Sequence, residues 1–209
     1  MFTLVQHPKS KFFILFFAIA VVVATTLFVI SDEAFVRSSL FARSKRYYSG
    51  PPEERAASWM IDAYATKYCK EHNMELIHIG DFTEPFRNLP FGIWLRSYSN
   101  QTLDEGRRQT LVLVQDFLRQ LQHDRRAQVW YDVRKKSPKY KAEPATIPLS
   151  AVGVKIAYWD KEVHRPQAPF LAEVRFYDNT FYYFVADSKT QALKPVAQES
   201  YEQALQQIQ

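Results

Sequence analysis

The stretch TLDEGRRQTLVLVQDFLRQLQ, residues 102–122, is the strongest fold signal in the sequence. Thr102 and Glu105 have the spacing of a capping box, in which the two side chains satisfy the first backbone N–H groups of a helix. Apolar residues then recur at helical spacing, and they are Leu111, Val114, Leu118 and Leu121. We therefore predict a helix over 102–122 that buries one face against a core.

A second helix is predicted to begin at Glu53, where apolar residues also recur at helical spacing. Acidic residues at positions 53 and 54 suit the positive end of a helix dipole. Two strands are predicted between the helices, Met74–Ile79 and Phe91–Tyr98, with a proline-containing loop between them. The apolar positions of this helix are Ala57, Met60, Ile61, Tyr64 and Tyr68.

The chain after residue 122 has the alternating pattern of β-strands. Alternation is found at Val129, Tyr131 and Val133, and again over 152–158. Phe170–Tyr177 and Phe181–Ala186 flank Asp178-Asn179-Thr180, which predicts a hairpin with a tight turn. Pro195 is expected to separate the last strand from a short polar helix that contains Tyr201, Leu205 and Ile208.

Composition and the predicted elements together indicate the fold class. A hydrophobic fraction of 47% and a charged fraction of 23% are typical of a folded domain rather than a disordered chain. A single cysteine excludes an internal disulfide framework. We predict an α+β protein: one N-terminal transmembrane helix, then one two-layer domain with two main helices and an antiparallel sheet of four to six strands.

The transmembrane helix is predicted at residues 12–30, FFILFFAIAVVVATTLFVI, which carry no charge, proline or glycine. As a helix these residues span about 28 Å, close to the hydrocarbon thickness of a bilayer. A cleaved signal usually has a shorter apolar region, and a buried helix apolar on every face would need protein all around it. We expect a retained span after a tail at 1–11, followed by a juxtamembrane linker at 31–52 and a soluble domain at 53–209.

The charges beside this span give opposing orientation signals. Lys9 and Lys11 precede it, and Asp32 and Glu33 follow it directly, which favours a cytoplasmic N-terminus. Four basic residues follow within the window in which lysine and arginine determine topology, and they are Arg37, Arg43, Lys45 and Arg46. We favour the signal-anchor layout, with the N-terminus in the cytoplasm and the domain outside it.

The densest basic run follows the 102–122 helix and is interleaved with aromatic residues. Its members are Arg125, Arg126, Arg134, Lys135, Lys136, Lys139 and Lys141, with Trp130 and Tyr140 among them. A tethered domain can reach anionic lipid headgroups or an acidic protein partner, and no nucleic acid is expected. The alternative is a solvated strand end and loop, because charge runs usually face solvent. We predict a partner-binding or anionic-surface-binding region here.

Cys69, His72 and His78 come nearest to a metal site. A structural zinc site needs four ligands, and Asp81 or Glu84 would have to supply the fourth. The alternative is that Cys69 packs under the sheet while the histidines lie at a helix end and a strand edge. We therefore predict no metal and no cofactor.

Catalytic motifs are not evident in the sequence. It contains no nucleophile elbow, Walker loop, HExxH motif or dinucleotide fingerprint. His123 and Asp124 with a distant serine stay open as part of a triad, because adjacency in sequence does not define geometry. No catalytic residue is predicted, and an enzyme is disfavoured.

Three functions remain as hypotheses. The first is a binding or assembly module of a bacterial-type cell envelope, and the others are a tethered domain for a small ligand or lipid and a membrane-anchored hydrolase-like enzyme. The C-terminal part, which ends in ESYEQALQQI, resembles small membrane-tethered or secreted bacterial domains of unknown function. That resemblance implies no activity and no functional residues.

Overall fold

The computed structural model describes residues 50–80, 89–137, 144–160 and 165–208, all within the unit Tyr47–Gln209. The predicted tail at 1–11, the predicted span at 12–30 and most of the 31–52 linker lie outside the described residues. Within those four described ranges, no helix is long and apolar enough to cross a membrane.

The described chain forms an α+β domain with a six-stranded sheet in the order β1-β2-β3-β4-β5-β6. Its elements are α2 (Pro52–Glu71), β1 (Met74–Ile79), β2 (Phe91–Ser97), α3 (Leu103–His123), α4 (Arg125–Lys135), the 3-10 helix η2 (Leu149–Ala151), β3 (Val152–Tyr158), β4 (Glu173–Tyr177), β5 (Thr180–Ala186), β6 (Leu193–Ser200) and α5 (Tyr201–Gln206).

The sheet is mixed, so the prediction of an antiparallel sheet is wrong in one respect. Strands β2 and β3 pair in parallel from Phe91↔Val152 to Ser97↔Tyr158, whereas the other neighbouring pairs are antiparallel. Parallel neighbours need a long crossover, and here α3 and α4 provide it. The hydrophobic pattern predicted the strands but carried no information on their direction.

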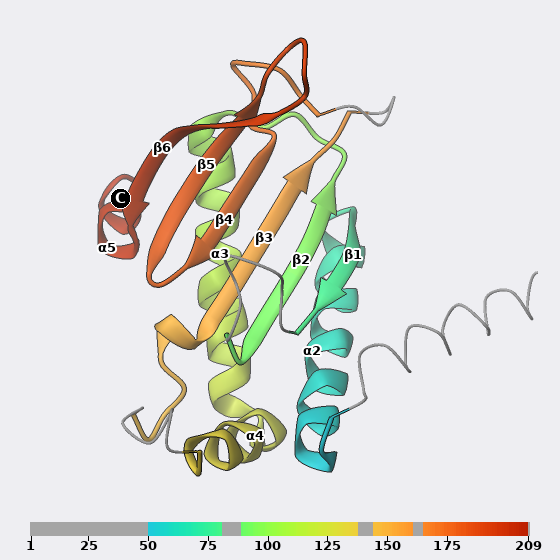
Figure 1. The fold of residues 1–209 in the computed structure, drawn as a ribbon, viewed down its shortest axis with the longest axis vertical. Helices are drawn as coiled ribbons and strands as arrows, with labels where there is room; N and C mark the ends of the chain where they lie inside the picture. Colours follow the sequence, from blue (N-terminus) through green and yellow to red (C-terminus); the bar gives the residue numbers. More distant parts are fainter. Residues whose placement is uncertain (1–49, 81–88, 138–143, 161–164, 209) are drawn as a thin grey trace, which may run out of the picture. The chain divides into compact units, whose positions relative to one another are not determined.

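Helices α2 and α3 cover one face of the sheet, and in Figure 1 they lie behind it. The central strands direct alternate side chains toward these helices, as the strand period of two requires. Ile93 and Leu95 on β2 and their partners Val154 and Ile156 on β3 are fully buried there. The strand predicted at Phe91–Tyr98 is therefore confirmed, with Ile93 and Leu95 on its core face.

Helix α3 is capped as predicted but buries a wider face. Thr102 and Glu105 form the capping box, with a backbone hydrogen bond of 2.8 Å from the Thr102 amide to the glutamate carboxylate. Leu111, Val114 and Leu121 are buried, but Leu118 is only partly buried. Phe117 is fully buried and stacks on Tyr64 of α2 at 5.3 Å, because α3 packs against helices as well as the sheet.

The strand predicted around Val129, Tyr131 and Val133 is wrong, since these residues lie in helix α4. The Asp124 carboxylate caps this helix by accepting a hydrogen bond from the Arg126 amide at 2.8 Å. Ala127 and Tyr131, four residues apart, supply its buried face, whereas Val129 is 39% exposed. A short apolar pattern does not distinguish a strand from a helix. The Asp124 cap, a helix-start signal, favours the helix here.

The C-terminal hairpin is confirmed, and the role expected for Pro195 is corrected. Asp178 and Asn179 have positive φ angles of 49° and 59°, as a two-residue turn between β4 and β5 requires. Pro195 lies inside β6, at the edge of the sheet, where a missing N–H is tolerated. The predicted C-terminal helix follows as α5.

A buried polar cluster joins α3 to the C-terminal strands. Arg107 Nε donates to Glu199 Oε1 at 2.6 Å, and the Tyr183 hydroxyl donates to the same oxygen at 2.5 Å. Gln207 donates to the other carboxylate oxygen at 3.0 Å. Burial, reinforced by the hydrogen bond to Glu199, raises the pKa of Tyr183 well above its usual range. The cluster ties β5, β6 and the C-terminal segment to the α3 layer.

We expect Glu199→Ala to lower the free energy of unfolding by about 3–5 kcal/mol, because it leaves a buried guanidinium without its main partner. The matched control is Asp104→Ala, which removes a carboxylate that is 80% exposed and pairs with the same Arg107. That control should cost about 1 kcal/mol or less. Urea unfolding of the full chain in mild detergent measures both, and equal losses would contradict a buried clamp.

Candidate functional site

None of the described helices packs on the second face of the sheet, which is turned toward the viewer in Figure 1. We call it the open face. The residues that form it alternate with the core residues of each strand. They are Trp94 and Arg96 on β2, Lys155 on β3, Trp159 just after β3, Glu173 and Arg175 on β4, and Tyr182 and Phe184 on β5.

A buried carboxylate organises the cations of the open face. The Glu173 side chain is only 3% exposed, lies 3.2 Å from Lys155 Nζ and is also paired with Arg175. Burial lowers the pKa of Lys155, and the Glu173 carboxylate acts in the opposite direction. The Lys155 ammonium also lies over the Trp94 ring at 4.0 Å. Two cations are therefore held in place by one acid and an indole ring.

The guanidinium groups of this region lie against aromatic rings. Arg96 is 5.1 Å from the centre of the Trp159 ring, and Arg165 is 6.0 Å from the same ring. Arg175 is 4.6 Å from the Phe184 ring. A guanidinium stacked in this way keeps its N–H edge available for planar acceptors such as carboxylates. The stacking therefore orients several donors on one surface.

Three N–H donors of the open face are buried and have no acceptor in the described structure. They are Trp94 Nε1, Arg96 Nε and Trp159 Nε1, which come from neighbouring positions on β2 and β3. A buried donor without an acceptor costs about 1–3 kcal/mol. Native proteins rarely keep such groups unless another molecule satisfies them. The open face therefore has the chemistry of a surface that binds an acceptor-rich partner.

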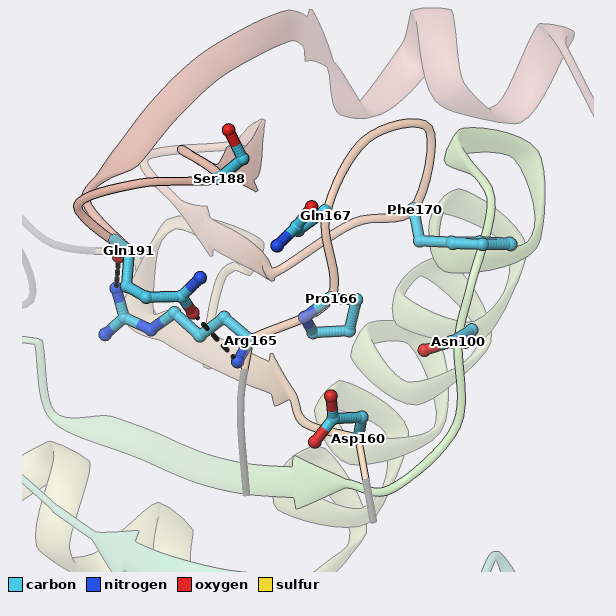
Figure 2. A pocket seen from close by; sticks show the side chains of 8 residues that line it. All are labelled: Asn100, Asp160, Arg165, Pro166, Gln167, Phe170, Ser188 and Gln191. Carbon is cyan, nitrogen blue, oxygen red and sulfur yellow. Dashed lines mark hydrogen bonds between the residues drawn. The ribbon is translucent and has the colours of Figure 1, made fainter. Parts of the chain in front are cut away.

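A polar pocket of about 510 Å3 lies beyond the carboxyl ends of β2 and β3 (Figure 2). We call it the edge pocket. Ligands of open sheets commonly bind beyond the carboxyl ends of parallel strands. Its polar lining consists of Asn100, Asp160, Arg165, Gln167, Ser188 and Gln191. Figure 2 shows Asn100 and Asp160 on one side, Ser188 and Gln191 on the other, and Gln167 between them.

Two segments are fastened together at the edge pocket. The Arg165 amide donates to the Gln191 side chain at 3.2 Å, and Arg165 Nη1 donates to the Gln191 carbonyl at 3.1 Å. Phe170 and Pro166 add apolar surface. The centre of the Trp159 ring is 6.0 Å from Arg165 of the pocket and 5.1 Å from Arg96 of the open face, so this ring lies near both. The lining can hydrogen-bond a small polar ligand through both donors and acceptors.

The aromatic residues of VRFYDNTFYYFV do not line this pocket, and three of them pack in the core of the domain. Phe176, Phe181 and Tyr183 are fully buried in the core. Tyr177 and Tyr182 stack on each other at 4.5 Å on the opposite side of the hairpin. Strand alternation divides these aromatics between core and open face, so the edge pocket is built by loops instead.

The predicted basic run occupies helix α4 and does not reach the open face or the edge pocket. Arg126 pairs with Asp124 at 2.7 Å, and Lys135 pairs with Asp132 at 3.0 Å. Trp130 packs against the core, whereas Arg125 and Lys136 are exposed and Arg134 is partly exposed. Lys139, Tyr140 and Lys141 lie outside the described residues. The binding role of this run remains a prediction.

The residues considered for metal binding or catalysis are dispersed. Cys69 is buried, and the His72 ring stacks on Tyr68 at 4.1 Å. His78 lies on β1, and Asp81 and Glu84 fall outside the described residues. Among the residues that the structure describes, no three His, Cys, Asp or Glu side chains gather closely enough to hold a metal ion. His123 Nδ1 lies 2.7 Å from the Arg119 carbonyl oxygen, one turn earlier in α3.

The sequence indicated an exposed sheet face as a possible place of function but did not identify its residues. Its signal was present as Trp94-x-Arg96 in one predicted strand and Lys155 near Trp159 at another. Polar and aromatic residues alternate there with apolar ones, which indicates a second face of different chemistry. The parallel pairing that brings these two strands together was not predictable from the alternation.

Asp187 accepts the hydrogen bonds that hold the turn at residues 187–190, beside the edge pocket. The stability of this turn should therefore depend on pH. A hydrogen bond from Lys194, with others from the amides of Thr190 and Lys189, holds the pKa of the Asp187 carboxyl well below its usual range. A lowered folded-state pKa stabilises the turn above the unfolded pKa, and this is lost as pH falls through the folded value. Asp187→Asn removes that contribution at every pH.

We therefore expect Asp187→Asn to speed amide hydrogen exchange at positions 189 and 190 at neutral pH. The ratio of variant to parent exchange rates should approach one as the solution is acidified through the folded-state pKa of Asp187. Asp178→Asn, in the other hairpin turn, is the control and should leave these two amides unchanged. A ratio that does not vary with pH would contradict the assigned role.

No protein-family model, curated protein or solved structure matches the chain. A fold of this class hosts many functions, so function has to be argued from the site itself. The open face and the edge pocket, which meet at Trp159, are the two features that bear on it.

Proposed function

We propose that the chain is a single-pass, membrane-anchored binding module whose domain lies outside the cytoplasm in a bacterial-type envelope and holds a protein partner on its open face. The observation that carries the proposal is the set of three buried N–H donors without acceptors on that face. Because these atoms are covered by the chain itself, a partner that supplies carboxylate or carbonyl oxygens would satisfy them only after the covering side chains move. No catalytic step is assigned.

The charge of the open face favours an acidic segment of that partner. Arg96, Lys155 and Arg175 lie there with two carboxylates, the buried Glu173 and Glu75 on β1, which pairs with Arg96 at 3.2 Å. Arg165 adds a further cation near Trp159. Tryptophan, tyrosine and arginine are also the residue types that dominate binding energy at protein interfaces. A peptide with acidic side chains can meet the stacked guanidinium edges directly.

The membrane anchor is proposed from residues 12–30, whose uncharged length matches a bilayer. The short basic tail before them favours a cytoplasmic N-terminus, so the domain is proposed to lie on the other side. In that compartment the accessible partners are envelope proteins and lipid headgroups.

A tethered small-ligand domain is the second candidate, and the edge pocket favours it. Its volume of about 510 Å3 falls in the range of small-molecule sites. Its lining is dominated by amides, a carboxylate and a hydroxyl, which suits a small polar ligand better than a lipid tail. The two candidate sites lie close to each other only at Trp159.

The orientation is tested by protease treatment of intact spheroplasts that express the full chain. We expect the C-terminal domain to be degraded while a cytoplasmic marker protein survives. Protection of the domain until the cells are lysed would place it in the cytoplasm and overturn the proposed compartment.

The binding face is tested by photo-crosslinking in cells. A benzophenone amino acid placed at position 182, on the open face, should give a discrete adduct, whereas the same group at Val112, an exposed residue of α3, should not. Arg96→Ala should reduce the adduct roughly tenfold, the change that loss of about 1.4 kcal/mol of binding energy produces. Arg108→Ala, at an exposed position of α3, is the matched control.

Two results would contradict the proposed binding face. One is an adduct of equal yield from position 112. The other is an adduct from position 182 that is insensitive to Arg96→Ala, because the partner would then not depend on the donors of the open face.

A further inference from the structure

Helix α4 lies at the end of the domain opposite the edge pocket. Helix α3 begins just after β2 and runs back along the sheet for 21 residues before α4 starts. In Figure 1, α4 lies beside the first turns of α2, where the described chain begins, and the carboxyl ends of β2 and β3 lie at the other end. The chain therefore enters the domain beside α4.

The outward stripe of α4 carries exposed cations around an exposed valine. Arg125, Val129, Asp132 and Lys136 follow one another at helical spacing, opposite the buried residues Ala127 and Tyr131. Arg125 and Lys136 are exposed, and Val129 is 39% exposed. The Asp132 carboxylate is neutralised by Lys135 at 3.0 Å. The stripe is therefore cationic at both ends and apolar in the middle.

The charge of this end of the domain is positive. Residues 124–136 contain five cations and two carboxylates, a net charge of +3, and Glu53, Glu54 and Arg55 at the start of α2 contribute −1. The sum is +2. Each lysine or arginine near an anionic bilayer contributes about 1 kcal/mol of attraction. The positive charge of the α4 end therefore complements an anionic surface and not a neutral one.

The proposed anchor keeps such a surface within reach. The predicted span ends at residue 30 and α2 begins at residue 52, so at most about 75 Å of extended chain joins them. A tether of this length holds α4 and the bilayer surface at a high effective concentration relative to each other. Weak electrostatic contacts are then sufficient to orient the domain.

We propose that α4 binds the anionic phospholipid headgroups of the bilayer that anchors the chain, through Arg125 and Lys136 with Val129 between them. This proposal rests on the membrane anchor of the proposed function. It has a geometric consequence, because the edge pocket at the opposite end of the strands is then presented away from the bilayer.

The test uses the full chain reconstituted in lipid nanodiscs whose headgroups carry a nitroxide quencher. A fluorescent amino acid is placed at position 129 or, as the control, at position 112, and both positions hold exposed valines in the parent chain. We expect strong quenching at position 129 in discs that contain phosphatidylglycerol, and weak quenching there in discs of phosphatidylcholine alone. Position 112 should be weakly quenched in both.

Charge reversal identifies the contact. Arg125→Glu with Lys136→Glu should lower the docked fraction at position 129 roughly tenfold or more. Arg108→Glu, at an exposed position of α3, should leave it unchanged. Raising the salt concentration should release the parent domain in the same way, because surface charge interactions are screened.

The outcomes separate the proposal from the function on which it rests. A chain that fails to insert into discs overturns the membrane anchor. A chain that inserts but shows equal quenching at positions 129 and 112, or quenching independent of phosphatidylglycerol, overturns the role of α4 alone. Binding of α4 to a soluble polyanion such as heparin, without quenching by disc lipids, would also overturn the lipid assignment.

Discussion

Strands β2 and β3 run in the same direction, so the chain that leaves β2 at Ser97 must travel the length of the sheet before it enters β3 at Val152. Helices α3 and α4 make that return on one face only. As a result, none of the helices in the described residues covers the other face. The edge pocket lies beyond the carboxyl ends of the two strands, and α4 lies at their amino ends. Every candidate surface depends on this one parallel pairing.

The open face combines a satisfied ion cluster with unsatisfied donors, and the contrast is informative. Glu173 is almost fully buried and is compensated by Lys155 and Arg175, as a stable buried charge requires. The indole N–H groups of Trp94 and Trp159 and the Nε of Arg96 have no acceptor, although Arg96 Nη1 pairs with Glu75 at 3.2 Å. Structural stabilisation explains the first group but not the second, since each unpaired donor opposes folding. The proposed binding of a partner would account for them.

Much of the fold could be predicted where local chemistry determines it. The capping box at Thr102 and the turn residues Asp178 and Asn179 depend on neighbours within a few positions. The direction of β3 depends on a partner some sixty residues earlier, and alternation is the same for either direction. Helix α4 was missed because Val129, Tyr131 and Val133 match a strand period, while the buried pair Ala127 and Tyr131 is visible only with the core in place.

The candidate site was less predictable than the fold for a related reason. A basic run is easily recognised in a sequence, but in α4 two of its cations form ion pairs with Asp124 and Asp132. The cations of the open face are isolated in sequence, each preceded by an apolar residue, and become a cluster only when the strands pair. Closeness in the sequence therefore suggested a larger free charge on α4 than the structure has. It gave no sign of the cation cluster on the open face.

The strand axis also determines how the two proposed surfaces relate. It runs from the α4 end to the edge pocket, whereas the open face looks out perpendicular to it, as side chains of a sheet do. If α4 rests on the bilayer, the open face stands upright, and a protein partner docks from the side while a small ligand enters from the far end. The two kinds of binding then differ in their approach and meet only at Trp159, whose ring contacts Arg96 on one side and Arg165 on the other.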